Sequence, residues 1–250
     1  MISIITAVRN GARDMPATLA SVEKQDHSDI EHIVVDGAST DGTVEVVRRE
    51  GRRVARLVSE PDAGVYDAFN KGLQLASGDV IGYLNAGDTY TAPDVVRRIA
   101  AQFALADVEA TFGDVVIVDP ANPDNVLRHY RSSSFTPARL ASGFMPAHPT
   151  LFIRRDTYER CGRYDPSYRI AGDFELCIRL FVEQKVRYTY VPDVLVRMPL
   201  GGLSNSGWRS KWTITQEMRR ACREHGLRTS YPRLFARFPM KLLEVLRHDP

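Results

Sequence analysis

The first 105 residues alternate between short apolar runs and amphipathic segments, and this alternation restricts the fold more than any other feature of the chain. Four runs have the length and composition of buried strands: residues 2–6, 30–35, 54–58 and 80–84. Helical patterns occupy residues 15–25, 43–50, 65–76 and 93–103. Such repetition predicts an α/β fold with a mainly parallel sheet and right-handed crossovers.

Three of these apolar runs end in loops that contain an aspartate. Asp36, Asp62 and Asp88 follow the second, third and fourth runs, each among small turn-forming residues. In open α/β sheets, ligands bind beyond the carboxyl ends of the strands. Because Mg²⁺ takes one or two protein carboxylates and shares its other ligands with phosphate oxygens, we expect a metal and a diphosphate to meet at the end of residues 78–88.

After residue 105 the strict alternation ends. Short strands are predicted at residues 110–112, 115–118, 126–130, 151–153 and 187–191, with a turn at 119–125 and a helix from about 170 to 182. Residues 201–207 form a loop that is either a lid or a plain connection. Two helices close the chain at 208–224 and 234–247, the second one kinked near Pro239.

The composition excludes several other classes of protein. With 44% hydrophobic and 26% charged residues the chain is typical of globular proteins, and no run approaches the length of a membrane span. The segment MISIITAVRN looks like a first core strand and not like a signal peptide. Three widely spaced cysteines favour buried thiols in a cytoplasmic protein over a zinc site or a disulfide framework.

Five stretches along residues 1–200 resemble glycosyltransferase family 2, whose members have the GT-A fold. They are SIITAVRN, HIVVDGASTDGT, SEPDAGVYDAFNKGLQLASGDVIGYLNAGD, HPTLFIRRDTYERCGRYD and IAGDFELCIRL. The resemblance implies a Rossmann-like, mostly parallel sheet flanked by helices. It also implies a catalytic domain at 1–200, with a nucleotide-sugar-binding half at 1–105 and an acceptor-binding half at 106–200, before a basic helical tail at 201–250.

The resemblance further assigns roles to single residues. Asp173 matches the general base of inverting members, and Asp88 matches the last carboxylate of a DxD-type metal motif for Mg²⁺ or Mn²⁺. Many members have two adjacent or alternate aspartates here, whereas this chain has Asn85-Ala86-Gly87-Asp88 with one carboxylate, so Asn85 or His148 is a candidate for a further ligand. The donor would be bound by Thr6, Ala7, Arg9, Asn10, Asp36, Asp62, Asn85 and Asp88.

Glycosyl transfer from a nucleotide sugar makes two chemical demands, one on a carboxylate that binds a cation and one on a carboxylate that acts as a base. The leaving diphosphate gains negative charge, which a cation at Asp88 would offset. The acceptor hydroxyl is a poor nucleophile, and Asp173 would take its proton as the new bond forms. Taken outside the family pattern, each residue has a plainer explanation: a turn for Asp88, a helix N-cap for Asp173 and a structural histidine for His148.

Residues 201–250 hold ten Lys and Arg against four Asp and Glu, a net charge of +6. A basic amphipathic helix at 234–247 favours contact with an anionic membrane surface, and packing on the catalytic domain is the alternative.

The resulting hypothesis is an inverting glycosyltransferase that moves a sugar from a nucleoside diphosphate donor to a lipid-linked glycan or glycolipid acceptor in cell-envelope polysaccharide biosynthesis. We expect it in the cytoplasm, peripheral on the inner face of the membrane, with no nucleic acid partner. Two alternatives are a non-catalytic nucleotide-binding scaffold and a sugar nucleotidyltransferase. The second needs a glycine-rich basic phosphate loop, for which TAVRNGARDM is a poor candidate.

Overall fold

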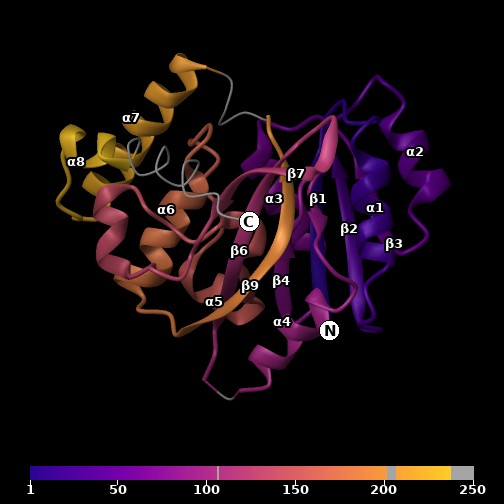
Figure 1. Ribbon diagram of the computed structural model, residues 1–250, viewed down its shortest axis with the longest axis horizontal. Coiled ribbons are helices and arrows are strands. Elements are labelled where there is room, and N and C mark those ends of the chain that lie inside the picture. Colours follow the sequence, from indigo (N-terminus) through magenta and orange to yellow (C-terminus); the bar gives the residue numbers. More distant parts are fainter. Residues whose placement is uncertain (106, 202–206, 238–250) are drawn as a thin grey trace.

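The computed structural model describes residues 1–105, 107–201 and 207–237. One nine-stranded sheet runs through this part of the chain, in the order β3-β2-β1-β4-β8-β6-β9-β5, with β7 paired to β6. Figure 1 shows the sheet curving through the molecule, with the N-terminal strands and α1 and α2 on one side and α6, α7 and α8 on the other.

The N-terminal half contains every strand and helix that the sequence predicts there. Its strands are β1 (Ile2–Val8), β2 (Ile30–Asp36), β3 (Val54–Ser59) and β4 (Val80–Tyr83). They pair in parallel, so their carboxyl ends share one edge, at the top of Figure 1 and opposite the N-terminus. The helices are α1 (Met15–Glu23), α2 (Thr43–Glu50), α3 (Val65–Leu75) and α4 (Val95–Phe103).

Helices cover both faces of these strands because the apolar residues of each strand point alternately to either side. On β1, Ile5 belongs to the same buried cluster as Phe69 and Leu73 of α3. The neighbouring Ile4 lies in a second cluster, with Val22 of α1 and Ile99 of α4. The alternation that the sequence shows is thus the cause of the layered arrangement.

The second half of the sheet is mixed. Its strands are β5 (Thr89–Tyr90), β6 (Ala110–Asp119), β7 (Asn122–Tyr130), β8 (Phe152–Arg154) and β9 (Tyr188–Pro199). β6 and β9 are parallel, whereas β8 is antiparallel to both β4 and β6. Gly82 of β4 leaves room for a ring of β8, since a Cβ there would lie 2.2 Å from Phe152 Cε1.

Three predicted elements of this half are wrong. The two short strands at 110–112 and 115–118 are one strand, and β7 begins inside the predicted turn. β9 continues to Pro199 instead of ending at residue 191, because it pairs with β6 along its whole length. Pro192 falls where the register shifts between Tyr190 and Val194, a bulge in which a missing N–H is tolerated.

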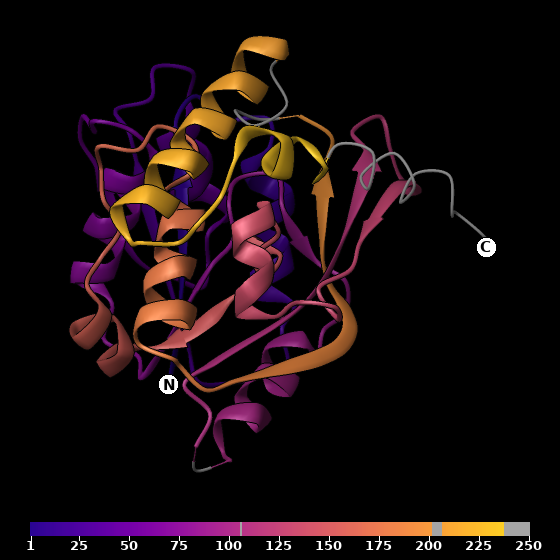
Figure 2. The same cartoon turned by 90° about the vertical axis from the view of Figure 1, so that its left-hand side faces the viewer.

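Helices pack beside this half of the sheet. They are α5 (Arg155–Cys161), α6 (Gly172–Ile178) with a π-helical continuation (Arg179–Glu183), α7 (Trp208–Glu224) and α8 (Tyr231–Phe235), besides two 3₁₀ turns (Pro137–Ser142 and His148–Thr150). α7 has the predicted bounds and lies against α6 (Figure 2). Of the predicted helix at 234–247, residues 238–247 lie outside the described residues, as do 202–206 of the predicted loop.

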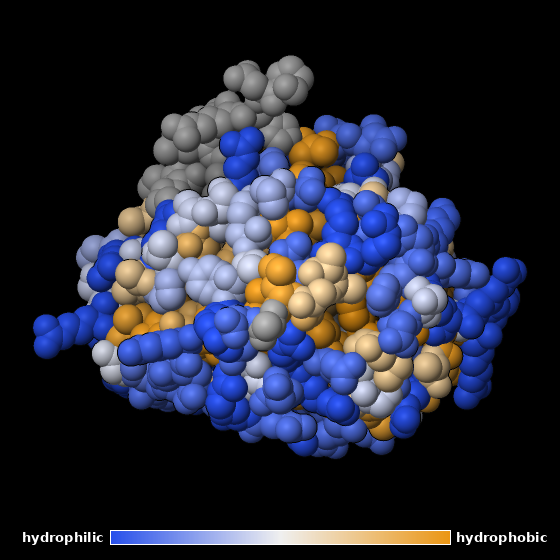
Figure 3. Space-filling view, turned by 90° about the horizontal axis from the view of Figure 1, so that it is seen from below, coloured by the Kyte–Doolittle hydropathy of each residue, from blue (hydrophilic) through white to orange (hydrophobic). Residues whose placement is uncertain are grey.

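None of the helices within the described ranges combines the length and the apolar character needed to span a bilayer. Figure 3 views the molecule from below, at the amino ends of the parallel strands, and there apolar residues form only small patches between hydrophilic ones. The division of the chain into catalytic halves and a tail stays a prediction.

Candidate active site

Asp36 ends β2 at the shared edge of the parallel strands. Its Oδ2 accepts hydrogen bonds from the backbone N–H of Ser39 (3.0 Å) and from the hydroxyl of Ser59 (2.6 Å), the last residue of β3. Its Oδ1 is buried and has no hydrogen-bond partner in the described structure. A buried acceptor without a partner is costly, so a donor group on a ligand would lower the free energy of this site.

Asp62 lies in contact with the residue that follows Asp36. A Cβ on Gly37 would lie 2.2 Å from Asp62 Oδ2 and 3.4 Å from Arg9 Cβ. Asp62 is fixed from its other side, where Oδ1 accepts the N–H of Gly64 at 3.0 Å. The missing side chain at position 37 thus allows the ends of β1, β2 and β3 to converge.

The loop after β1 is tied to the loop after β2. Asn10 adopts a left-handed conformation (φ 52°), donates its N–H to Ser39 Oγ (2.7 Å) and accepts the N–H of Thr40 (2.9 Å). The N–H of Ala12 donates to Asp41 Oδ2 at 3.0 Å. These bonds hold the exposed Arg9 and Asn10 beside Asp36, and their role in donor binding stays a prediction.

Thr6 differs from the other predicted donor residues. It is fully buried, and its Oγ1 lies 3.0 Å from His32 Nε2 on the neighbouring strand. Burial lowers the pKa of His32 to about 4, so the ring is neutral near pH 7. Thr6 therefore supports the sheet under the pocket, and Ala7 beside it is only partly exposed.

Asp88 is a buried carboxyl group in the loop after β4. Burial raises its pKa to about 8, against the opposing effect of the Asn85 backbone N–H. Thr18 of α1 fixes the loop, because its hydroxyl donates to the carbonyl oxygen of Asp88 and accepts the N–H of Gly87, both at 2.9 Å. Asn85 Oδ1 is buried there, and the described structure gives it no partner.

A carboxylate and an amide oxygen are ligands that Mg²⁺ and Mn²⁺ accept. Asp88 and the unpartnered Oδ1 of Asn85 thus fit part of a cation's coordination shell. Within the described ranges, no group of three or more His, Cys, Asp and Glu side chains could hold a metal ion. The chain therefore supplies only part of such a shell, and a donor diphosphate would have to complete it.

His148 lies among aromatic rings. Its ring centre is 5.6 Å from that of Phe69 and 6.0 Å from that of Tyr83, and both ring nitrogens are buried with no partner among the described residues. Burial lowers its pKa, and the charge of Asp173 opposes that effect. The electrostatics thus relate His148 to Asp173, not to Asp88.

Asp173 is the second residue of α6. Its Oδ1 accepts the N–H of Phe174 (2.8 Å) and, more weakly, the hydroxyl of Tyr66 (3.3 Å), which also donates to the carbonyl oxygen of Ile170 at the shorter distance of 2.5 Å. Burial raises the pKa of Asp173, whereas His148 and the two hydrogen bonds to Oδ1 lower it. Gly172 allows the contact, because a Cβ there would lie 2.8 Å from Tyr66 Cε2. Tyr66 is the second residue of α3, shortly after the loop of Asp62, so the contact joins the two halves of the chain.

Two residues of this region have no place in the sequence-based prediction. Tyr66 holds Asp173, and Glu217 of α7 holds the segment before it, accepting the N–H groups of Arg169, Ile170 and Ala171 at 2.8, 2.9 and 2.8 Å. A signal existed for each of them. Tyr66 lies at the start of the best-defined amphipathic helix, and Glu217 is one of four acids in a basic tail.

Residues 3–162 match the family described as Glycosyl transferase family 2. The chain belongs to this family. Its relatives include a PGL/p-HBAD biosynthesis glycosyltransferase of Mycobacterium bovis, 31% identical over 212 residues, which cover 82% of this chain and 80% of that protein. An uncharacterized glycosyltransferase of Mycobacterium tuberculosis is 31% identical over 184 residues, 71% of this chain and 68% of that one.

Solved structures of glycosyltransferases share the fold of this enzyme. A crystal structure of S. aureus TarS 1–349 in complex with UDP-GlcNAc gives a TM-score of 0.70 at 16% identity, over 88% of this chain and 66% of that one. The mannosyltransferase PcManGT of Pyrobaculum calidifontis, in complex with GDP-Man and Mn²⁺, gives 0.65 at 21% identity, over 98% and 72%. The predicted GT-A fold is confirmed.

The strand order places the predicted site residues of this glycosyltransferase along one edge. Because β3, β2, β1 and β4 are neighbours in that order, Asp62, Asp36, Arg9 and Asp88 follow one another at their carboxyl ends. Asp173 lies against Tyr66, beside Asp62. The carboxylates along this edge are groups that can accept hydrogen bonds and ligate a cation, and Asp173 is a carboxyl group apart from them.

Proposed function

We propose that this glycosyltransferase moves a sugar from a nucleoside diphosphate donor to an acceptor hydroxyl with inversion at the anomeric carbon, and that Asp173 is its general base. The observation that carries the proposal is the contact between Tyr66 and Asp173, which sets one carboxyl group apart from Asp36, Asp62 and Asp88. A base on a separate loop suits attack from the face opposite the leaving group.

Asp36, Asp62, Arg9 and Asn10 would bind the nucleoside part of the donor. The free Oδ1 of Asp36 would accept a hydrogen bond from the base or the ribose. Asp88 and Asn85 would hold Mg²⁺ or Mn²⁺, which when bound offsets the charge of the leaving diphosphate. The complexes of TarS with UDP-GlcNAc and of PcManGT with GDP-Man and Mn²⁺ support this assignment by analogy of fold.

Asp173 would accept the proton of the acceptor hydroxyl. The hydroxyl of Tyr66 and the N–H of Phe174 stabilise its ionised form, which is the form a base needs. His148 remains neutral near pH 7 because burial lowers its pKa, so it would contact the acceptor without competing for the proton.

The acceptor in this proposal is a lipid-linked glycan or glycolipid of the cell envelope, met at the cytoplasmic face of the membrane. The name of the mycobacterial relative, PGL/p-HBAD biosynthesis glycosyltransferase, supports an envelope role. In this proposal residues 1–105 bind the donor, 106–200 face the acceptor, and 201–250 bring the enzyme to an anionic membrane surface.

The first test is a thermal-shift screen with UDP, GDP and dTDP, each with and without Mn²⁺, followed by donor turnover with the nucleotide sugars of the stabilising base. We expect one nucleotide to stabilise the protein, more strongly with Mn²⁺, and Asp173→Asn to lose transfer while it keeps nucleotide binding. Full transfer activity of Asp173→Asn would remove the proposed base. Stabilisation without any turnover would favour the scaffold alternative.

A further inference from the structure

The outer face of α7 and α8 exposes aromatic side chains. In the described part of the chain, six large hydrophobic residues are exposed, and three of them are here: Trp208 (74% exposed), Trp212 (43%) and Phe235 (38%). The Trp212 ring stacks on those of Tyr231 and Phe235, with centroids 5.7 and 6.2 Å away. Trp208, Lys211, Trp212 and Phe235 line an open cavity of about 370 Å³.

Most of the exposed charged residues in the described segment 207–237 are basic. The exposed basic residues of residues 207–237 are Arg209, Lys211, Arg219, Arg223, Arg228 and Arg233. The two acids of the same segment are both engaged with the body of the protein. Glu217 binds the N–H groups of residues 169–171, and Glu224 accepts the hydroxyl of Tyr168 at 2.6 Å.

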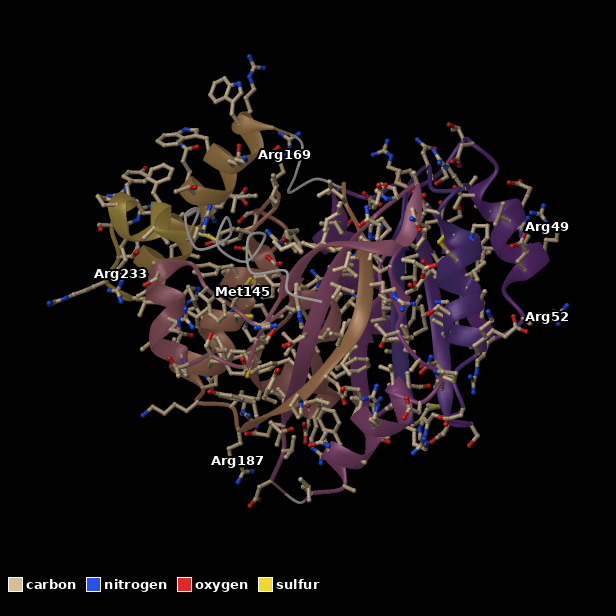
Figure 4. The ribbon with its side chains drawn as sticks, viewed as in Figure 1. Arg49, Arg52, Met145, Arg169, Arg187 and Arg233 are labelled. Carbon is tan, nitrogen blue, oxygen red and sulfur yellow. The ribbon has the colours of Figure 1, made fainter. Side chains whose placement is uncertain are left out.

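The geometry of α7 places its acidic residues on one side of the helix and its exposed aromatic and basic residues on the other. At about 100° per residue, Glu217 lies on the side of the helix opposite Trp208, and Trp212 and Arg219 lie on the side of Trp208. In Figure 1, α7 begins at the upper edge of the molecule, the edge at which the parallel strands end. Figure 4 shows Arg169 at this edge beside α7 and Arg233 at the far side of α8.

We infer that this face, which we call the aromatic–basic face (Trp208, Arg209, Lys211, Trp212, Arg219, Tyr231, Arg233 and Phe235), binds the surface of an anionic lipid bilayer. Tryptophan and tyrosine are enriched where a bilayer meets water, because one part of the ring system is apolar and another is polar. Lysine and arginine around them are attracted to anionic headgroups. An aromatic rim with basic neighbours fits that partner by both shape and charge, since Glu217 and Glu224, the acids of residues 207–237, lie on the other side of α7.

The inference rests on the lipid-linked acceptor of the proposed function and deepens that proposal. It assigns the membrane contact to a different segment from the one that the sequence predicts. The sequence pattern places that contact on residues 234–247, whereas the described structure places exposed aromatic rings on residues 208–235. Arg237, one of the basic residues of the predicted amphipathic helix, is buried and donates to Thr215 Oγ1 at 2.9 Å. It is therefore turned toward α7 and not outward.

The test uses the fluorescence of the full-length chain. The chain has two tryptophans, and both belong to the aromatic–basic face, so their emission reports this surface alone. Vesicles of phosphatidylcholine with phosphatidylglycerol should shift the emission to shorter wavelength, and brominated lipid should quench it. Vesicles of phosphatidylcholine alone should do so much less. The vesicle experiment needs neither donor nor acceptor. Absence of vesicle binding would therefore not affect the transferase proposal, and absence of sugar transfer would not affect the vesicle result.

Variants then locate the contact by co-sedimentation with the same anionic vesicles. Trp208→Ser, at a position exposed enough to spare the fold, should weaken binding on the order of tenfold. Arg209→Glu with Lys211→Glu should weaken it roughly twenty-fivefold or more, because each basic residue near an anionic surface contributes about fivefold. The matched control is Arg49→Glu in the last turn of α2 with Arg52→Glu just beyond it, an equal change of charge on the far side of the molecule in Figure 4, which should have little effect.

Four results with vesicles would overturn the inference, and a fifth concerns the oligomeric state. The four are equal binding to neutral vesicles, no effect of Trp208→Ser, an equal effect of the Arg49 and Arg52 control, and loss of binding with Lys241→Glu and Arg247→Glu alone. The last result would assign the contact to residues 238–250. A dimer that Trp208→Ser dissociates would assign the face to a second copy of the chain.

Discussion

Glu217→Gln is the most direct test of how the position of Asp173 is maintained. In the wild type, Glu217 Oε1 accepts the N–H of Arg169, and Oε2 accepts those of Ile170 and Ala171. A glutamine has one carbonyl oxygen, which keeps at most two of these bonds. The amide N–H₂ group of the glutamine would then face the remaining backbone N–H, so one hydrogen bond is lost. The other two hydrogen bonds would go to a neutral oxygen instead of a charged carboxylate.

Hydrogen bonds to charged groups contribute about 1.5–3 kcal/mol, and the carboxylate of Glu217 is only partly buried. The variant should therefore weaken the hold on residues 169–171 by about 2 kcal/mol. Because about 1.4 kcal/mol is a factor of ten, we expect kcat to fall on the order of tenfold while the KM for the donor changes little. Steady-state kinetics and urea denaturation measure the two effects separately.

The control is Glu224→Gln, two turns further along α7. Glu224 accepts the hydroxyl of Tyr168 and pairs with Arg220 at 2.8 Å, but it does not contact the N–H groups of residues 169–171. It should lose a similar amount of stability and little kcat. If both variants lose kcat equally, or if Glu217→Gln keeps its kcat at reduced stability, the reasoning is refuted.

Three further predictions concern the sheet edge and its support. Tyr66→Phe removes a hydrogen bond that stabilises ionised Asp173, so the pKa of that carboxyl should rise. The acidic limb of the kcat–pH profile should then move to higher pH. An unmoved limb would show that Tyr66 does not act on the group that titrates there. Gly37→Ala should raise the nucleotide Kd on the order of tenfold, because the new methyl displaces Asp62; calorimetry that gives a wild-type Kd would contradict the packing. Burial lowers the pKa of His32 to about 4, so between about pH 4 and 6.5 the unfolded chain binds more protons than the folded chain. The free energy of unfolding should therefore fall as the pH drops through that range, by up to about 3 kcal/mol. Urea denaturation should show no such fall in His32→Gln.

The first half of the fold can be predicted from the sequence because its elements are local and regular. β1, β2 and β4 are short apolar runs buried on both faces, whereas β3 is partly exposed at the end of the sheet. α3 shows a continuous apolar side. Asp36, Asp62 and Asp88 follow directly, since parallel strands bring their carboxyl ends to one edge. The family resemblance adds Asp173, which no local pattern marks.

The second half is harder to predict because pairing between distant segments decides it. β9 extends through Pro192 to Pro199 only because β6 lies beside it, and nothing within residues 192–199 shows that partner. The same holds for Thr6, whose hydroxyl meets His32 of the neighbouring strand below the pocket. The role of Glu217 depends on a contact across 46 to 48 residues of chain, which composition and periodicity do not report.

The two sides of α7 hold different kinds of residue, and this separation has a consequence for how the sequence of such an enzyme can change. The acids that face the protein body and the rings and bases that face outward alternate within one helix of 17 residues. Exchanging outward residues would then alter the proposed membrane contact without touching the segment that holds the proposed base, so the two properties can change independently along this helix.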